Sequence, residues 1–523
     1  QNHNRRLFLP CDEAITLVPP DPRYTTDKDK TVTDSQNNQW KTLDKDLGRV
    51  NHLEYASHVV ARPLVGSGIA LVFIVLTGFA ALIVFGGEPL SFVVVAAAVF
   101  GAYMAINIGA NDVANNMGPA VGAKALSMGG AILIAAIFES LGALLAGGDV
   151  VSTIAKGIID PAGFTDPKVF IWAMMAALIS AAIWVNLATV LGAPVSTTHS
   201  VVGGVMGAGV AAAGFAVVNW PTMAKIAASW VISPVMGGLV AAGFLALIKA
   251  KIIYQDDKIA AARRWVPILI AIMAAAFASY LATKGLKRII KIDLVTSLAI
   301  GAGIGVITYF ITKPIIRRQS QGLENRNKSL KKLFLIPLVL SAALLSFAHG
   351  ANDVANAVGP LAAIVHAVEF GDTAAKVAIP AWVMVIGALG ISFGLFLFGP
   401  KLIRMVGGQI TKLNPMRAYC VALSAAITVI IASTLGLPVS STHIAVGAVF
   451  GVGFFREWHM ERRIKLDLKT PKQGKSLARA ERGRRKLVRR SHFLTIIAAW
   501  VITVPAAALL SGVIFLLINA LTS

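Results

Sequence analysis

The sequence predicts an all-α polytopic membrane protein, and three observations support this fold class. Of its 523 residues, 56% are hydrophobic and only 14% are charged, whereas a soluble domain is typically about 45–50% apolar and about 25% charged. The mean hydropathy is +0.72. Thirteen stretches also approach the roughly 20 apolar residues that span a bilayer as a helix, namely 64–86, 90–112, 126–147, 168–192, 194–218, 223–249, 266–283, 293–313, 333–357, 378–398, 417–436, 438–455 and 493–519.

The chain is strongly basic, with a net charge of +22, and basic chains often bind nucleic acid. Here the charge lies in the connections between apolar stretches; Arg456–Arg490 alone holds 14 Lys/Arg against 4 acidic residues. Positive loops favour the cytoplasm. We therefore expect a multi-pass protein of the plasma (inner) membrane with a cytoplasmic N-terminus, in contact with lipid and not with nucleic acid. The two cysteines, Cys11 and Cys420, exclude a disulfide framework.

Two strings occur twice, in the same order. Gly109–Ala123 (GANDVANNMGPAVGA) matches Gly350–Ile364 (GANDVANAVGPLAAI) at 9 of 15 positions. Leu191–Gly209 (LGAPVSTTHSVVGGVMGAG) matches Leu435–Gly453 (LGLPVSSTHIAVGAVFGVG) at 12 of 19 positions. The chain is therefore a duplication of one unit.

The duplication divides the chain into segments. We expect a polar, largely disordered cytoplasmic arm at 1–62, an extra transmembrane helix at 63–89, a first repeat at 90–250, linking helices at 251–331, and a second repeat at 332–520 with a basic cytoplasmic loop at 456–490.

The two stretches led by proline, 194–218 and 438–455, are either full crossings or re-entrant segments. Charge placement favours net crossing. The first GANDVAN string then lies on the second stretch and its copy on the ninth, an odd shift that inverts the repeats in the membrane. Inverted repeats with polar, Gly/Pro-interrupted segments at matching positions are typical of secondary transporters.

The GANDVAN strings place carboxylate and amide oxygens on one helical turn inside apolar stretches. Ionisable groups at this depth mark ion or substrate pathways by default, and oxygen ligands suit a hard cation such as Na⁺, or a proton. Nearby glycines, with Pro119 and Pro360, permit local unwinding. The alternative is a polar network that only packs helices. The predicted coupling-cation residues are Asn111, Asp112, Asn115, Asn352, Asp353 and Asn356, with Na⁺ expected at Asp112 and Asp353.

The second string is suited to an anion. Pro194 and Pro438 favour the first turn of a helix, and hydroxyl groups at a helix N-terminus complete a typical anion site. Two such ends facing each other would bind a tetrahedral oxyanion without Arg or Lys. The alternative is that the hydroxyls merely cap their own helices. The predicted substrate residues are Ser196, Thr197, Thr198, Ser440, Ser441 and Thr442.

Other polar residues are weaker candidates. His199 and His443 end the hydroxyl strings and either relay a proton or pack. Glu139 is a lone carboxylate in an apolar stretch and is a further candidate for a cation or proton. We place His349 and Lys124 at helix boundaries.

With these motifs the chain resembles the inorganic phosphate transporter (PiT) family over roughly Phe100–Lys249 and Lys332–Ala520. The resemblance implies a cation-coupled symporter that imports phosphate, with the Asn/Asp strings and Glu139 on the cation and the Ser/Thr strings on phosphate. Two features depart from the family. Arg417–Ser433 lacks an acidic residue that many relatives carry, and the first 86 residues have no counterpart in the family's repeat core.

The sequence thus favours a symporter that imports inorganic phosphate with Na⁺ or H⁺ by alternating access; the same architecture carrying sulfate is the alternative. An intramembrane metalloenzyme lacks support, because HExxH and a nucleophile–base pair are both missing and catalysis does not need a symmetric pair of sites. A channel is a further alternative, which saturable, cation-dependent uptake would exclude. We expect no enzyme activity and no cofactor besides the coupling ion. The oligomeric state stays open, with a homodimer as one option.

Overall fold

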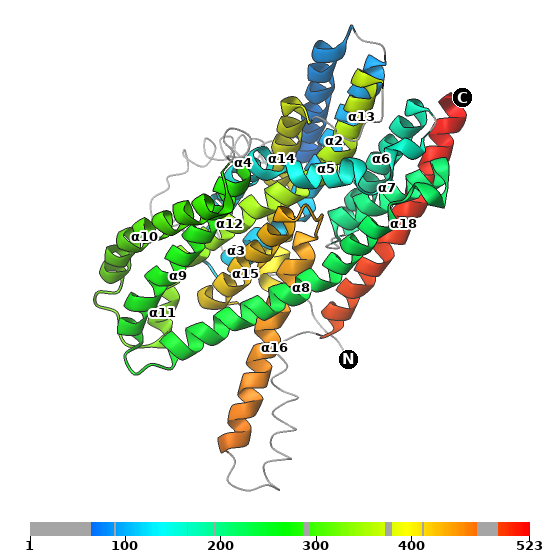
Figure 1. The fold of residues 1–523 in the computed structure, drawn as a ribbon. Helices are drawn as coiled ribbons and strands as arrows, with labels where there is room; N and C mark the ends of the chain where they lie inside the picture. Colours follow the sequence, from blue (N-terminus) through cyan, green and yellow to red (C-terminus); the bar gives the residue numbers. More distant parts are fainter. Residues whose placement is uncertain are drawn as a thin grey trace, which may run out of the picture. The chain divides into compact units, whose positions relative to one another are not determined.

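The computed structural model describes residues 64–87, 90–164, 166–191, 195–285, 292–371, 379–409, 413–467 and 490–522. From Gly66 onward the chain forms one compact unit, and its described part is almost entirely helical (Figure 1). Outside the helices, the described residues form one isolated antiparallel β-bridge, between Ile159 and Val218. The arm predicted at 1–62 lies outside the described residues.

Eleven helices in the described ranges are long and apolar enough to cross a membrane. They account for all the predicted stretches except the two led by proline. The extra N-terminal helix is among them, at Leu64–Phe85, and Phe73 on it packs against Phe393 with ring centroids 4.8 Å apart. The fold class predicted from composition, an all-α polytopic membrane protein, is confirmed, with eleven candidate spans instead of thirteen.

The first repeat and the linking region contain the following helices. They are α2 (Ser91–Asn111), α3 (Val113–Gly122), α4 (Met128–Ala146), α5 (Gly148–Lys156), η1 (Pro161–Gly163), α6 (Pro167–Leu191), α7 (Thr197–Ala213), η2 (Phe215–Val217), α8 (Trp220–Ile248), η3 (Lys249–Ile253), α9 (Lys258–Tyr280), η4 (Leu281–Gly285), α10 (Leu294–Gln319) and α11 (Asn327–Leu333).

The second repeat contains α12 (Leu335–Asp353), α13 (Ala355–Phe370), α14 (Ala381–Gln409), α15 (Pro415–Thr434), α16 (Ser441–Asp467) and α18 (Arg490–Thr522). The basic cytoplasmic loop predicted at 456–490 starts inside α16, which continues as one helix to Asp467 (Figure 1); its cytoplasmic placement stays a prediction. The intervening residues 468–489 lie outside the described part.

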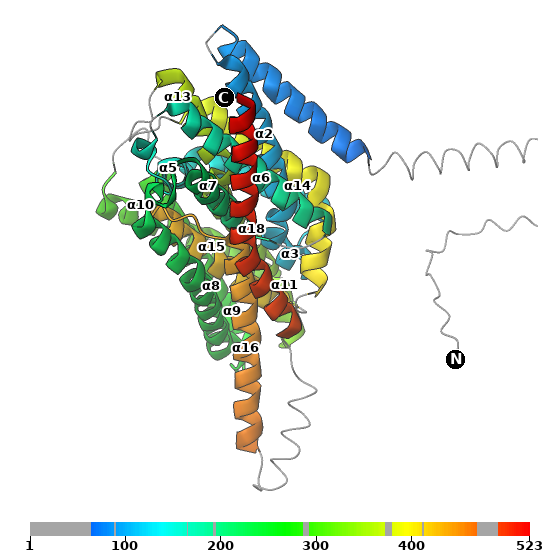
Figure 2. The same ribbon diagram turned by 90° about the vertical axis from the view of Figure 1, so that its right-hand side faces the viewer.

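The two halves pack reciprocally. Helix α18 packs on α6 and α7, as Figure 2 shows, and α8 packs on the equivalent helices α15 and α16. Likewise α14 packs on α2 and α4 packs on α12. At the contact of α4 with α14, Ser140 and Ser392 lie 2.9 Å apart through their Oγ atoms, and Ser392 donates to the carbonyl of Ala136 at 3.1 Å. The segment FESLGALL of α4 aligns with GISFGLFL of α14, so these two serines are equivalent residues that meet each other.

The repeated strings pass each other with opposite chain directions. Gly101, at the middle of α2, faces Leu361 in α13. Asp112, at the end of α2, lies beside Asp353 at the end of α12. The inversion of the two repeats in the membrane stays a prediction.

Helices α6 and α7 form a hairpin. Before α6 and after α7 the chain comes together, where Asp160 N–H donates to the Val217 carbonyl at 2.8 Å and Asn219 N–H to the Ile158 carbonyl at 2.9 Å. The other end of the hairpin lies beside Asp112. The first proline-led segment therefore returns to the end at which α6 starts, with the turn beside the predicted cation residues. Helix α7 has 17 residues and is not among the candidate spans of the described ranges; whether this segment crosses or re-enters stays a prediction.

The motif glycines serve close helix packing. A Cβ on Gly350 would lie 2.1 Å from the Glu139 carbonyl oxygen, and a Cβ on Gly109 would lie 1.9 Å from that of Ile391. Real Cβ atoms do not approach oxygen so closely. Both positions therefore require glycine where α12 crosses α4 and where α2 crosses α14.

Candidate functional site

Both GANDVAN strings lie where one helix gives way to another. Helix α2 ends at Asn111 and α3 begins at Val113, so Asp112 occupies the joint. In the second copy the joint follows Asp353. Pro119 lies within α3 and Pro360 lies within α13. Because proline has no N–H, each removes the usual helical donor to the backbone carbonyl four residues earlier. Those carbonyls belong to Asn115 and Asn356, which are predicted cation residues.

All the predicted site residues are buried. Each is at most 3% exposed, and the set comprises Asn111, Asp112, Asn115, Glu139, Ser196, Thr197, Thr198, His199, Asn352, Asp353, Asn356, Ser440, Ser441, Thr442 and His443. Buried polar groups need partners, and these side chains find them largely in one another.

Each aspartate accepts a hydrogen bond from the hydroxyl string of its own half. Thr197 donates to Asp112 Oδ2 at 2.6 Å, and the equivalent Ser441 donates to Asp353 Oδ2 at 2.8 Å. Hydrogen bonds to ionised acceptors are about twice as strong as neutral ones. The predicted cation residues and the predicted anion residues therefore form one continuous cluster.

Each asparagine, in contrast, binds a hydroxyl of the other half. Asn115 Nδ2 donates to Thr442 Oγ1 at 2.9 Å, and Asn356 Nδ2 donates to Thr198 Oγ1 at 3.1 Å. Thr442 in turn donates to Asp112 Oδ1 at 3.0 Å. The site is therefore assembled across the interface between the repeats.

Ser196 and Ser440 have a different part. Their Oγ atoms accept from the backbone N–H groups of His199 at 3.1 Å and His443 at 3.3 Å. These are N-cap bonds, so for the two serines the capping alternative describes the contacts present. Pro194 lies outside the described residues. Pro438 accepts a hydrogen bond on its carbonyl from Trp230 Nε1 at 3.1 Å.

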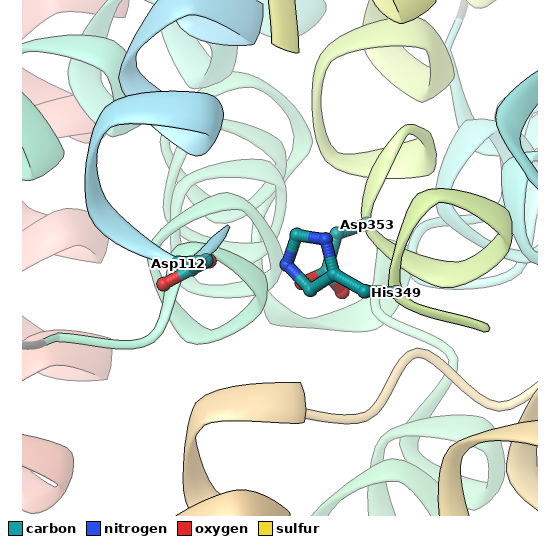
Figure 3. Close-up of side chains that lie close together, drawn as sticks. All are labelled: Asp112, His349 and Asp353. Atoms are coloured by element: carbon teal, nitrogen blue, oxygen red, sulfur yellow. The ribbon is translucent and has the colours of Figure 1, made fainter. Parts of the chain in front are cut away.

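Figure 3 shows His349, a histidine that sequence reasoning placed wrongly, beside Asp353 and near Asp112. His349 is fully buried rather than at a helix boundary. Its Nδ1 lies 2.5 Å from Glu139 Oε2 and its Nε2 lies 2.7 Å from Asp353 Oδ2. One ligand atom from each of Asp112, His349 and Asp353 falls within 4.8 Å of the others (Figure 3). The first repeat has Ile108 at the equivalent position, and this difference was the available signal.

Glu139 joins the cluster through His349. Its other oxygen, Oε1, accepts from Asn116 Nδ2 at 2.9 Å. It is therefore linked to Asp353 by the imidazole. Lys124, at the end of α3, is exposed, in agreement with the predicted boundary position.

The donor set fits a hard monovalent cation. It offers two carboxylates and several amide oxygens, and oxygen ligands of this kind suit such ions. Two buried amide oxygens, Asn116 Oδ1 and Asn356 Oδ1, have no hydrogen-bond partner among the described residues. An unpaired buried acceptor is costly, and a bound cation would satisfy it.

The two predicted relay histidines face each other. The ring centroids of His199 and His443 lie 4.4 Å apart, and His199 also packs edge-on against Trp230 at 3.8 Å. They sit one residue beyond the hydroxyls of Thr198 and Thr442. A proton-relay role for either ring stays a prediction.

Comparison with known proteins identifies the family of the chain. Residues 108–511 match the model of the phosphate transporter family. Two relatives, both named "Putative phosphate permease", come from Helicobacter pylori, at 46% identity over 90% of this chain and 98% of the relative, and from Pyrococcus abyssi, at 38% identity over 80% and 96%.

A solved structure described as "The sodium-dependent phosphate transporter" is also similar, with a TM-score of 0.72 and 35% identity over 82% of this chain and 99% of that one. The family consists of transporters and not of enzymes, and the protein is a multi-pass membrane protein with no expected cofactor besides a coupling ion. The chain belongs to the phosphate transporter family.

Proposed function

We propose that the protein is a secondary active symporter that imports inorganic phosphate with Na⁺ by alternating access. The observation that carries the proposal is the sharing of hydroxyls between the two sets of ligands. Thr197 and Thr442, which we assign to phosphate, donate to Asp112, which we assign to the cation. Occupancy of one set must therefore change the other.

The shared hydroxyls suggest how binding is ordered. A threonine hydroxyl has a single O–H to donate. While the carboxylate of Asp112 is unneutralised it takes that donor, and its negative charge also repels an anion. A cation on Asp112 and Asp353 screens this charge and occupies carboxylate lone pairs. The hydroxyls of Thr197, Ser441 and Thr442 are then able to turn toward phosphate oxygens.

The same arrangement explains why the site needs no Arg or Lys. The described residues that surround the aspartates are neutral apart from Glu139 and His349. The bound cation supplies the counter-charge, so phosphate binds well only after the cation. In a symporter this order prevents uncoupled movement of the anion.

Alternating access follows from the cross-repeat bonds. Asn115 to Thr442 and Asn356 to Thr198 are equivalent contacts between the halves. Rocking one repeat against the other would break and remake them, as in transporters built from inverted repeats. We place the protein in the plasma (inner) membrane with a cytoplasmic N-terminus, on the charge distribution of its loops.

Uptake of labelled phosphate by proteoliposomes tests the proposal. An imposed inward Na⁺ gradient at equal pH should drive saturable accumulation, and a pH gradient without Na⁺ should not. Accumulation driven by the pH gradient alone would reassign the coupling ion to H⁺. Phosphate uptake independent of both gradients would contradict symport. Sulfate in excess should compete poorly, since the relatives reported above are named for phosphate.

A further inference from the structure

A second polar contact lies one helical turn from the site, between α2 and α6. Asn186 Nδ2 donates to Asn107 Oδ1 at 3.0 Å, and Asn107 Nδ2 donates to the Tyr103 carbonyl at 2.9 Å. Asn107 is 3% exposed. One turn further along, Asn111 Nδ2 donates to Thr189 Oγ1 at 2.9 Å. Amide and hydroxyl groups thus follow the contact of the two helices up to Asp112.

The equivalent contact in the second repeat is mostly apolar. The repeat alignment places Ala348 opposite Asn107 and Ile430 opposite Asn186. Only the inner pair is retained, with the amide of Asn352 2.9 Å from Ser433 Oγ. If this helix contact needed polar packing, both halves should have such a pair. The Asn107–Asn186 pair is present in the first half alone, so a packing need common to both halves does not explain it.

The difference between the halves continues on the far side of Asp112. Asn116 contacts Glu139, and Glu139 contacts His349. The equivalent positions hold Ala357, Ile391 and Ile108, all apolar. A continuous row of polar side chains therefore runs through the site at one set of positions. The equivalent positions, related by the repeat, are apolar.

We propose that Asn107 and Asn186, with Thr189, form an additional binding station for the coupling cation on its route to Asp112. The proposal rests on the proposed function and deepens it by assigning a one-sided cation path. The three side chains offer neutral oxygen ligands, which suit a hard monovalent cation. Because no carboxylate is present, the station holds the ion weakly and passes it to Asp112.

Helix packing by asparagine is the competing explanation, because amide pairs also join helices in membranes. The two explanations differ in what they predict for transport. A packing pair affects stability and leaves the apparent affinities for both substrates unchanged. A cation station affects the dependence of uptake on Na⁺ and leaves the affinity for phosphate at saturating Na⁺ unchanged.

The test compares Asn186→Leu with Ile430→Leu, the same final side chain at the equivalent position. We expect Asn186→Leu to raise the half-saturating Na⁺ concentration for phosphate uptake about tenfold, the effect of losing one interaction of hydrogen-bond strength. The half-saturating phosphate concentration at saturating Na⁺ should not change. Ile430→Leu should match the wild type in both measurements.

Asn186→Ser keeps an oxygen and provides a second variant should the leucine fail to insert. It should need less Na⁺ than the leucine variant, and should raise the requirement by less than tenfold. A wild-type Na⁺ requirement in both Asn186 variants would overturn the proposal, as would an equal shift in Ile430→Leu. Absence of Na⁺-driven uptake in the wild type would instead refute the proposed function.

Discussion

Replacing Asp112 by asparagine removes one charge from the cation site with little change of shape. The carboxylate accepts two hydrogen bonds, from Thr197 on Oδ2 and from Thr442 on Oδ1. The amide keeps one acceptor, and the hydroxyl facing the new NH₂ group is able to rotate and accept in its turn. The variant therefore tests charge more than packing.

The magnitude follows from the spacing of the ligands. The ligand atoms of Asp112, His349 and Asp353 lie within 4.8 Å of one another, so a cation between them is close to both carboxylates. Two unit charges about 4 Å apart interact by about 4 kcal/mol at an effective dielectric constant of about 20. Every 1.4 kcal/mol corresponds to about tenfold in affinity. Asp112→Asn should therefore weaken cation binding by about 1,000-fold.

The assay is Na⁺-driven phosphate uptake in proteoliposomes over a range of Na⁺ concentrations. We expect no measurable uptake by Asp112→Asn at any Na⁺ concentration that vesicles tolerate, and the same for Asp353→Asn. Asp293→Asn is the matched control. Asp293 caps α10 through the N–H groups of Val295 and Thr296, and asparagine caps a helix about as well as aspartate. A wild-type Na⁺ requirement in Asp112→Asn would refute the electrostatic reasoning.

Two further predictions concern stability. Gly350→Ala should lower the melting temperature of the purified protein, because its Cβ would lie 2.1 Å from the Glu139 carbonyl oxygen and overpacking costs about 1–3 kcal/mol or more. Gly303→Ala is the control and should leave the melting temperature unchanged, because a Cβ there meets nothing within 4 Å. Equal melting temperatures of the two variants would contradict the packing argument. Glu139→Gln should destabilise the protein by less than the about 3–5 kcal/mol of a fully broken buried ion pair, because His349 loses one of its two carboxylate partners and keeps Asp353 at 2.7 Å. Asn116→Ala removes only a hydrogen bond to Glu139, so it should lower the free energy of unfolding by less than Glu139→Gln, measured in the same detergent. A larger loss in Asn116→Ala would count against the Glu139–His349 pair.

The repeats explain why much of the fold was predictable. Hydropathy locates the spanning helices because each must bury its own backbone bonds in lipid, and duplication picks out Asp112 and Asp353 from among 26 acidic residues. The same method failed for His349, because it compares the copies for what they share. His349 stands where the first copy has isoleucine. Its partner Asp353 lies 4 positions away in the sequence, but its partner Glu139 lies 210 positions away. A local sequence pattern does not indicate a contact over 210 residues.

The hydroxyl strings show a second limit of local reasoning. A proline followed by Ser/Thr groups predicts donors at the start of a helix, but not what receives them. Ser196 turned out to cap its own helix, whereas Thr197 reaches a carboxylate 85 residues away. The distinction depends on which side chain of the first turn faces Asp112, which the tertiary packing of α7 decides.

The exchange of partners between the repeats has a consequence for coupling. Asn115 of the first half holds Thr442 of the second, and Asn356 holds Thr198 of the first, so neither half contains a complete set of ligands. In the proposed transport cycle, a displacement that separates the halves at this site would break both pairs, because each pair joins one repeat to the other. The free energy of ligand binding is then tied directly to the relative position of the halves. Placing the ligands within one repeat would leave that repeat able to move without sensing whether the site is filled.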